Sequence, residues 1–213
     1  MVMGWWWGEH VVGYKIGCVS TINQQTLGLP HPVWGNLWST EQYADGVQLR
    51  KADFANIAIE VEFAVTIKSA IDQHNITADD VVRAVDSALP VLELHHLVLR
   101  SDPPHGHELI ASNAIHAGVV RGTSTLALST VTETDLALIY DGAVIDSWSA
   151  IQWPHAVLGA IVWLAKALAE HGKRIEAGDT ILTGALGPRI AVNAATSVSV
   201  TSSAFGQVGA TFI

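Results

Sequence analysis

The chain has 213 residues, of which 49% are hydrophobic and only 15% charged, and its 20 acidic and 11 basic residues give a formal net charge of -9. A chain of this length can bury one sizeable core, so we expect a single domain over residues 1–213. The acidic balance argues against a nucleic-acid partner, whose phosphates attract basic proteins. The single cysteine, Cys18, excludes an intrachain disulfide and favours a cytoplasmic location.

No membrane-spanning segment is predicted. The apolar helical stretch at 155–172 is interrupted by Lys166 and Glu170 and is too short to cross a bilayer comfortably. The start, MVMGWWWGEH, has neither the basic region nor the long apolar region of a signal peptide. We therefore expect a soluble protein, and its low charge favours an oligomer that covers part of the apolar surface.

The first half of the chain begins with strands, which are predicted at 11–19 and 57–67. A helix is predicted over 76–89, because Thr77 is a suitable N-cap and Pro90 cannot continue a helix. This helix is the first strong helical pattern in the sequence.

The middle of the chain is β-like again from 91–99, and the Pro and Gly content of 101–108 predicts a loop. Short strands follow, at 117–121, 126–131, 136–140 and 144–148. The Asp-Gly pair at 141–142 predicts the turn of a hairpin between the last two of these strands.

The last part of the chain has a helix at 155–171, which Gly172 would end as a C′ residue. A turn and a strand are predicted over 177–184, and the small, β-branched residues of 190–213 predict further strands. Strands do not alternate regularly with helices, so a doubly wound parallel sheet is not expected. The pattern indicates a β-rich α+β domain.

Charged side chains interrupt two of the predicted strands. Glu60 and Glu62 stand two apart, so they point to the same face of the strand. Buried without a partner, they would cost several kcal/mol. A divalent cation such as Mg²⁺ or Mn²⁺ would stabilise them, with Glu93 as a third ligand. The alternatives are a solvated outer face for the glutamates and, for Lys15, a side chain that reaches out to water.

Five segments resemble a known family, and they occur in the family's order. They are VVGYKIGCVSTINQQTLGLPHPVWGNL (11–37), AIEVEFAV (58–65), LPVLEL (89–94), ASNAIHAGVVRG (111–122) and WLAKALAEHGKRIEAGDTILTGAL (163–186). The set is similar to the 2-hydroxypentadienoate (2-keto-4-pentenoate) hydratase and 4-oxalocrotonate decarboxylase branch of the fumarylacetoacetate hydrolase superfamily. The resemblance implies a mixed β roll or barrel with flanking helices.

The resemblance also implies a site. Glu60, Glu62 and Glu93 match the residues that hold one divalent metal ion in the family, usually Mg²⁺. Lys15 matches the lysine of the family's GYKIG segment and would move a proton or stabilise charge. Substrate-lining positions of relatives match Trp34, Gly35, Leu37, Asn113, Thr183 and Gly184.

The implied function is that of a metal-dependent lyase in the catabolism of aromatic compounds. It would be a hydratase that adds water to a small 2-hydroxy-dienoate or 2-oxo-alkenoate, and the chain would form a homo-oligomer. One alternative is a 2-oxo acid decarboxylase on the same metal site. Another is a divergent non-catalytic protein, or a partner in a hetero-oligomer with a sister pathway enzyme.

The sequence departs from the family at several places. Relatives carry several dozen residues before the GYKIG segment, whereas 12 precede it here, so either the start is misassigned or the chain is a shortened form, with residues 1–10 divergent. Relatives usually read close to EIVDSRI after the third glutamate, but this chain reads ELHHLVL. Trp148 and Trp153 indicate either a bulkier substrate or plain core packing.

The histidines leave several interpretations open. His105 and His107 have the spacing of a zinc-binding pair, but no third ligand is evident, and a plain solvated loop is the simpler interpretation. His96 or His116 could serve as an auxiliary acid or base. No role is assigned to His95.

Overall fold

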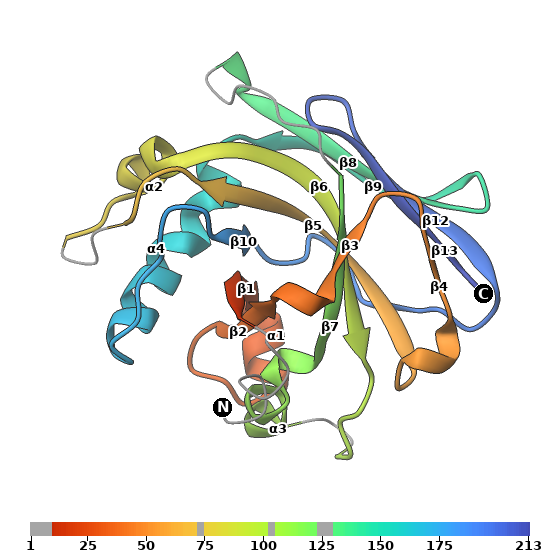
Figure 1. The fold of residues 1–213 in the computed structure, drawn as a ribbon. Coiled ribbons are helices and arrows are strands. Elements are labelled where there is room, and N and C mark those ends of the chain that lie inside the picture. The colour runs from red at the N-terminus through yellow and green to blue at the C-terminus, as the bar shows by residue number, and fades with distance from the viewer. Residues whose placement is uncertain (1–9, 72–74, 102–104, 123–129) are drawn as a thin grey trace.

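The computed structural model describes residues 10–71, 75–101, 105–122 and 130–213, in which the strands form two mixed sheets (Figure 1). The larger sheet is made of β1 (Val11–Gly17), β2 (Val33–Trp38), β3 (Gln42–Ala44), β5 (Ile57–Ile67), β6 (Val85–His96), β7 (His116–Arg121), β10 (Thr180–Leu182) and β11 (Ile190–Ala191). The smaller sheet is made of β4 (Val47–Leu49), β8 (Glu133–Tyr140), β9 (Ala143–Gln152), β12 (Thr196–Ser202) and β13 (Gly206–Phe212).

The larger sheet has the strand order β2-β1-β10-β5-β6-β7-β3, with β11 also paired to β5, and the smaller sheet has the order β4-β13-β12-β8-β9. Parallel pairs, such as β1 with β10, occur among antiparallel ones, such as β5 with β6. Figure 1 shows β5 and β6 as long curved strands that cross the molecule, with the smaller sheet at one side. The expectation of a β-rich α+β fold is confirmed.

The helices are α1 (Thr21–Thr26), α2 (Ala78–Ala84), α3 (Gly106–Ala111) and α4 (His155–Ala169), with short 3-10 turns at Ser39–Glu41, Lys51–Asp53 and Asn113–Ile115. Helix α2 begins with a capping box, in which the Thr77 hydroxyl and the Asp80 carboxylate each accept a backbone N–H of the other residue. Within the described residues, no helix combines the length and apolar content needed to cross a bilayer.

Several predicted elements are confirmed. Strand β5 has the predicted bounds of 57–67, and α4 begins at the predicted residue, His155. Gly172 has a positive φ of 65° just beyond the end of α4, as expected for a residue that ends a helix. Strands β8 and β9 form the predicted hairpin around residues 141 and 142.

The helix predicted over 76–89 is wrong in its second half. Helix α2 ends at Ala84, and Val85 begins the long strand β6. The residues that follow pair with β5, for example Ser87 with Thr66 and Pro90 with Phe63. Pairing with a neighbouring strand thus overrides a helical pattern that is convincing only when the local sequence is considered alone.

The loop predicted over 101–108 is also wrong in part, because α3 begins at Gly106. Residues 102–104 lie outside the described residues, as do 123–129, which include most of the strand predicted at 126–131. Residues 130 and 131 are not in a strand. The remaining strands at 117–121, 136–140, 144–148, 177–184 and 190–213 are present with shifted ends.

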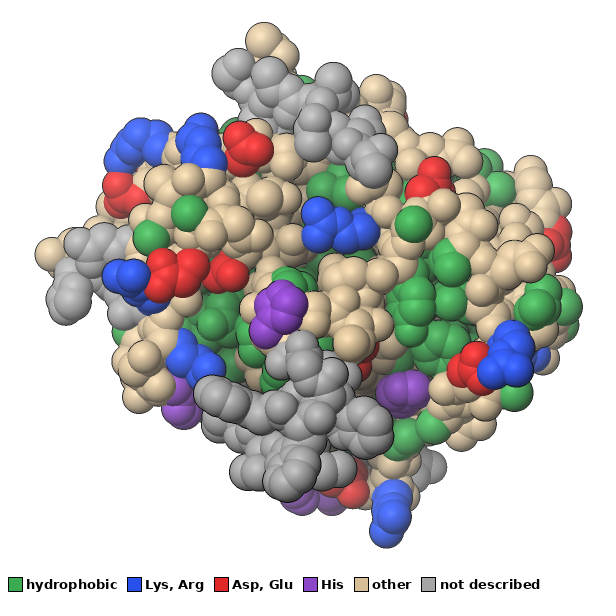
Figure 2. All heavy atoms as spheres, in the orientation of Figure 1, with side chains coloured by type: hydrophobic (Ala, Val, Ile, Leu, Met, Phe, Trp, Pro, Cys, Tyr) green, Lys and Arg blue, Asp and Glu red, His purple; other side chains and the backbone are tan. Residues whose placement is uncertain are grey.

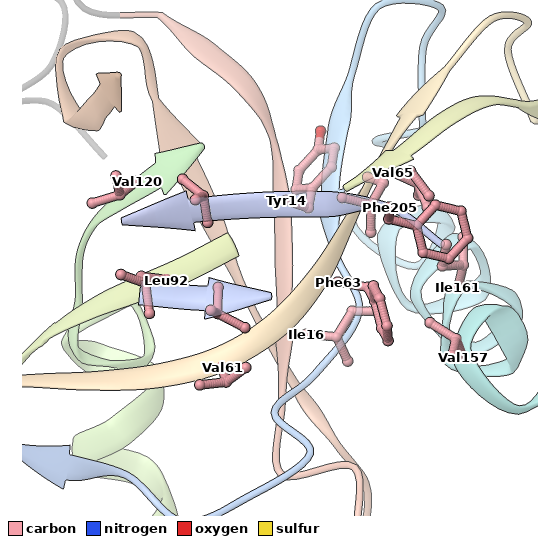
Figure 3. Packing of buried hydrophobic residues seen from close by; sticks show 14 of the residues in the cluster. Tyr14, Ile16, Val61, Phe63, Val65, Leu92, Val120, Val157, Ile161 and Phe205 are labelled. Carbon is pink, nitrogen blue, oxygen red and sulfur yellow. The ribbon is translucent and has the colours of Figure 1, made fainter. Parts of the chain in front are cut away.

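The two faces of the larger sheet have different roles. Alternate residues of β5, Val61, Phe63 and Val65, belong to the main hydrophobic core, and so do Ile16 of β1 and Leu92 of β6 (Figure 3). Figure 3 also shows Val157 and Ile161 of α4 beside Phe63 in this core. The side chains between these positions point to the opposite face of the sheet.

The core explains one of the unusual tryptophans. The Trp153 ring is only 4% exposed and packs against Phe63 and Phe205, with ring centroids 5.7 and 4.6 Å away. It is therefore a core residue, as the simpler of the two interpretations predicted. Trp148 is partly buried against the same core.

Gly13 is required for the pairing of β1 with β10. Its φ is 150°, and a Cβ atom at this position would lie 1.8 Å from the carbonyl oxygen of Thr180. We expect Gly13→Ala to lower the free energy of unfolding by about 3 kcal/mol, because backbone atoms would have to move apart. Gly159→Ala on the exposed side of α4 is the control, since nothing lies near its Cβ, and it should raise stability by about 0.5–1 kcal/mol. Urea unfolding of both variants tests this; equal stability would contradict it.

Candidate active site

The charged residues predicted from the sequence lie on the sheet face opposite the core. Glu60 of β5 and Glu93 of β6 are direct partners across the two strands. Lys15 of β1 is the partner of Leu182 in β10, the strand between β1 and β5. Neighbouring strands therefore bring together side chains that lie far apart in the sequence.

Glu93 is the centre of this cluster and is fully buried. Its Oε1 atom lies 3.0 Å from Lys15 Nζ and 2.7 Å from His116 Nδ1. Burial raises the pKa of the Glu93 carboxyl, but the positive charge of Lys15, aided by His95 and His116, outweighs burial and holds the pKa well below its usual range. Glu93 is therefore ionised.

The Lys15 ammonium is also buried, at 2% exposure, so the alternative of a lysine that reaches out to water is excluded. Burial lowers its pKa, but the carboxylates of Glu93, Glu60 and Glu62 together raise the pKa above the ordinary lysine value. Lys15 is consequently protonated.

Glu62 has a different environment from Glu93. It is 1% exposed, and its Oε2 atom accepts a hydrogen bond of 2.9 Å from the Gly184 backbone N–H. Burial, with the nearby charges of Glu93 and Glu60, raises the pKa of the Glu62 carboxyl well above its usual value. The burial of Glu62 and the low exposure of the Glu60 side chain, 18%, rule out the alternative of a solvated outer face for this pair.

A set of candidate metal ligands lies within this cluster. One ligand atom each of Glu60, Glu93 and His95 lies within 4.8 Å of the others, and no other group of three such side chains occurs in the described ranges. The Glu93 Oε2 atom is buried and has no hydrogen-bond partner among the described residues. An unpaired carboxylate oxygen beside a second carboxylate fits a divalent cation. Glu62 is not in this set, and its role as a ligand stays a prediction.

His95 is the residue that sequence reasoning missed. It is 1% exposed and stands two residues after Glu93, so strand alternation places both side chains on one face. The same rule that paired Glu60 with Glu62 could have found it. His96, by contrast, faces away from the cluster, and its Nδ1 atom accepts a hydrogen bond of 3.1 Å from the Ala55 backbone N–H.

His116, one of the two candidates for an auxiliary acid or base, contacts the cluster through Glu93. Burial lowers its pKa despite the raising effect of Glu93, which favours a neutral ring that donates its Nδ1–H to the carboxylate. His105 and His107 stack on each other with ring centroids 5.5 Å apart at the start of α3. Neither belongs to a group of three candidate ligands within the described residues.

A cavity of about 530 Å³ opens beside the cluster, and Lys15, Glu60 and His95 form part of its wall. Much of the remaining wall is apolar and includes Leu27, Val33, Leu97, Leu99 and Leu109. The cavity is large enough for a small organic acid. Figure 2 shows that charges of both signs are scattered over the face seen there and do not gather into one large patch.

The six predicted substrate-lining residues do not themselves line this cavity, although neighbours of several of them do, namely Val33, Ala114 and Ala185. Trp34 packs edge-on against Tyr14, and Leu37 is fully buried in an apolar cluster. Thr183 donates its hydroxyl to the carbonyl of Phe63 at 3.0 Å. Their role in substrate binding stays a prediction.

Asn113 makes a structural contact with strand β2, and Gly35 of that strand leaves room for it. The Asn113 Oδ1 atom accepts the backbone N–H of Asn36 at 2.8 Å, and its Nδ2 atom donates to the Asn36 carbonyl at 3.0 Å. A Cβ atom on Gly35 would lie 2.8 Å from Asn113 Oδ1. A glycine at position 35 thus lets the amide approach the strand.

The fold is that of the fumarylacetoacetate hydrolase family, and the curated relatives of this chain are lyases of that fold. A 2-keto-4-pentenoate hydratase of Burkholderia vietnamiensis is 31% identical over 207 residues, which cover 96% of this chain and 79% of the relative. A 4-oxalocrotonate decarboxylase of Pseudomonas putida is 26% identical over 208 residues, which cover 97% of this chain and 79% of the relative. The chain belongs to the family of these hydratases and decarboxylases.

A solved structure supports the same conclusion. The 4-oxalocrotonate decarboxylase of Pseudomonas putida G7, in complex with magnesium and adipate, superimposes with a TM-score of 0.88 at 25% identity, over 97% of this chain and 79% of that one. No protein-family model matches the chain. The resemblance inferred from the five sequence segments is confirmed.

Proposed function

We propose that this chain is a divalent-metal-dependent hydratase that adds water to a small 2-hydroxy-dienoate or 2-oxo-alkenoate. The observation that carries the proposal is the buried pair of Lys15 and Glu93 beside Glu60, at the wall of a cavity of about 530 Å³. Burial of an ammonium and several carboxylates is costly unless the charges are paired with one another or bind a metal ion. The hydratase named among the relatives supports this activity.

The metal-binding carboxylates and Lys15 have separate roles in this proposal. Glu60 and Glu93 would hold the cation, with Glu62 as the third ligand expected from the family. The cation, when bound, would supply a Lewis acid for the carboxylate and C2 oxygen of the substrate. Magnesium or manganese is the ion that carboxylate ligands favour.

Lys15 would then move protons. The dienol loses the proton of its 2-hydroxyl group and gains one at C5, so the double bonds shift to C2=O and C3=C4. The oxygen of water joins C4, which is now electrophilic, and a proton is added at C3. Lys15 holds the proton to be transferred, because its pKa lies above the ordinary lysine value and keeps the ammonium protonated, and the amine formed can recover a proton afterwards.

The cavity wall favours the hydratase over the decarboxylase. Among the described residues of the wall, the cationic side chains are Lys15 and Arg189, and both lie near the glutamates, with Arg189 Nη1 3.8 Å from Glu60 Oε1. The part of the wall formed by Leu97, Leu99 and Leu109 offers no cation for a second carboxylate. A substrate with one carboxylate and an apolar end therefore fits best.

The proposal is tested by following the loss of the dienoate chromophore with and without Mg²⁺ or Mn²⁺. Chelator-treated protein should be inactive and should recover when the metal ion is restored. Glu60→Gln should weaken metal binding by at least about tenfold in calorimetry, because even substitution of a residue that only contacts a metal ligand has an effect of this size. If wild-type protein binds no divalent ion at millimolar concentration, the hydratase proposal fails. Release of CO₂ from a 2-oxo-enedioate without hydration of the dienoate would assign the decarboxylase instead.

The remaining expectations also stay proposals. We expect a homo-oligomer, a cytoplasmic location and a place in aromatic catabolism, which fit the composition and the relatives' activities. Size-exclusion chromatography with light scattering tests whether the chain forms a homo-oligomer.

A further inference from the structure

We infer that His95 is a metal ligand, so that the site takes a first-row transition-metal ion such as Mn²⁺ or Co²⁺ through one imidazole and two carboxylates. This inference rests on the proposed function, because it concerns the same cation site. It differs from the three-carboxylate set expected from the resemblance, in which His95 has no part.

The His95 ring lies close enough to both carboxylates to share one ion with them. The His95 Nε2 atom lies 3.1 Å from Glu60 Oε2 and 3.5 Å from Glu93 Oε2. Neighbouring ligands of an octahedral or tetrahedral ion with bonds near 2.1 Å are about 3.0–3.4 Å apart. Despite this proximity, neither His95 ring nitrogen has a partner in hydrogen-bond geometry among the described residues.

The other atoms of the two carboxylates are already engaged. Glu93 Oε1 contacts Lys15 and His116, and Glu60 Oε1 faces Arg189 at 3.8 Å. The atoms left over are Glu93 Oε2, Glu60 Oε2 and His95 Nε2, and these three converge. Contacts on the far side of each carboxylate therefore orient the near side toward one point, as outer partners of metal ligands do.

Glu62 is held differently. Its Oε2 atom accepts the Gly184 backbone N–H at 2.9 Å, and Glu62 is not in the converging set. His95 is 1% exposed, lines the cavity wall and supplies the third ligand atom of that set. The charged side chains that the structure places against the His95 imidazole are those of Glu60 and Glu93, the two other candidate ligands.

An imidazole ligand changes which ion the site prefers. Mg²⁺ takes oxygen ligands almost exclusively, whereas imidazole nitrogen suits later first-row ions, and affinity for such sites rises from Mn²⁺ toward Ni²⁺ and Cu²⁺. We therefore expect Co²⁺ and Ni²⁺ to bind more tightly than Mn²⁺, and Mn²⁺ more tightly than Mg²⁺. Replacing His95 should reduce this preference and leave Mg²⁺ binding nearly unchanged.

The test is pulsed electron paramagnetic resonance of Mn²⁺ bound to the full chain, which detects a directly coordinated nitrogen. Wild-type protein should show a ¹⁴N coupling that becomes a ¹⁵N coupling when the histidines are ¹⁵N-labelled. His95→Leu, which keeps a similar volume, should lose the coupling. His96→Leu is the matched control, because the neighbouring ring faces away from the cluster, and it should keep the coupling.

Calorimetry separates the possible outcomes. His95→Leu should weaken Co²⁺ binding by at least about tenfold and change Mg²⁺ binding by less than about threefold. Mn²⁺ binding without nitrogen coupling in the wild type overturns the role of His95 but leaves the hydratase proposal standing. Coupling that persists in His95→Leu also overturns it and points to another histidine. No binding of any divalent ion by the wild type overturns both.

Discussion

Glu93→Gln is expected to abolish divalent-cation binding and to lower the free energy of unfolding by about 3 kcal/mol. The change keeps the size of the side chain but removes the charge that faces Lys15 Nζ at 3.0 Å. Removing one partner of a buried ion pair leaves the other charge without compensation. Glu60 and Glu62 limit the loss of stability, because both carboxylates still raise the pKa of Lys15.

Calorimetric titration with Mn²⁺ and urea unfolding measure the two effects of Glu93→Gln. Glu170→Gln is the control, since Glu170 is an exposed residue at the end of α4, and it should change stability by less than about 0.5 kcal/mol. A Glu93→Gln protein that binds Mn²⁺ with wild-type affinity would contradict the placement of Glu93 in the metal site.

Lys15→Met is expected to lower kcat for the dienoate by about 10²–10⁴-fold and to leave metal binding intact or tighter. Methionine retains the aliphatic volume of the buried lysine but can neither donate nor accept the proton. Loss of a positive charge next to Glu93 also favours a cation on the other carboxylate oxygen. Lys15→Met thus tests proton transfer separately from metal binding, which Glu93→Gln tests.

Steady-state kinetics and Mn²⁺ titration of Lys15→Met check both parts. Lys166→Met on the exposed side of α4 should retain wild-type activity, because it removes the same group far from the cluster. If Lys15→Met retained full kcat, the proton would have to come from another group, and His116, in contact with Glu93, would be the next to test.

The sequence was most informative where local rules and tertiary structure agree. Alternation in β5 predicted that Glu60 and Glu62 share a face, and in the structure Val61, the residue between them, lies in the core on the other face. The helix over 76–89 failed because Val85 and the residues after it pair with β5, a contact that no local pattern reveals. His95 was missed for a different reason: alternation placed it beside Glu93, but only the fold shows that both face the same carboxylate of the neighbouring strand.

The amide of Asn113 also has a consequence for the edge of the larger sheet. Strand β2 is the outermost strand on one side, and Asn113 stands just before β7, near the other side. Because its side chain pairs with both backbone groups of Asn36, it imitates one residue of a further strand. An open edge invites pairing with a second chain. The Asn113 amide therefore connects the two sides of the curled sheet. It also occupies the backbone groups of Asn36, which a strand of a second chain could otherwise pair with.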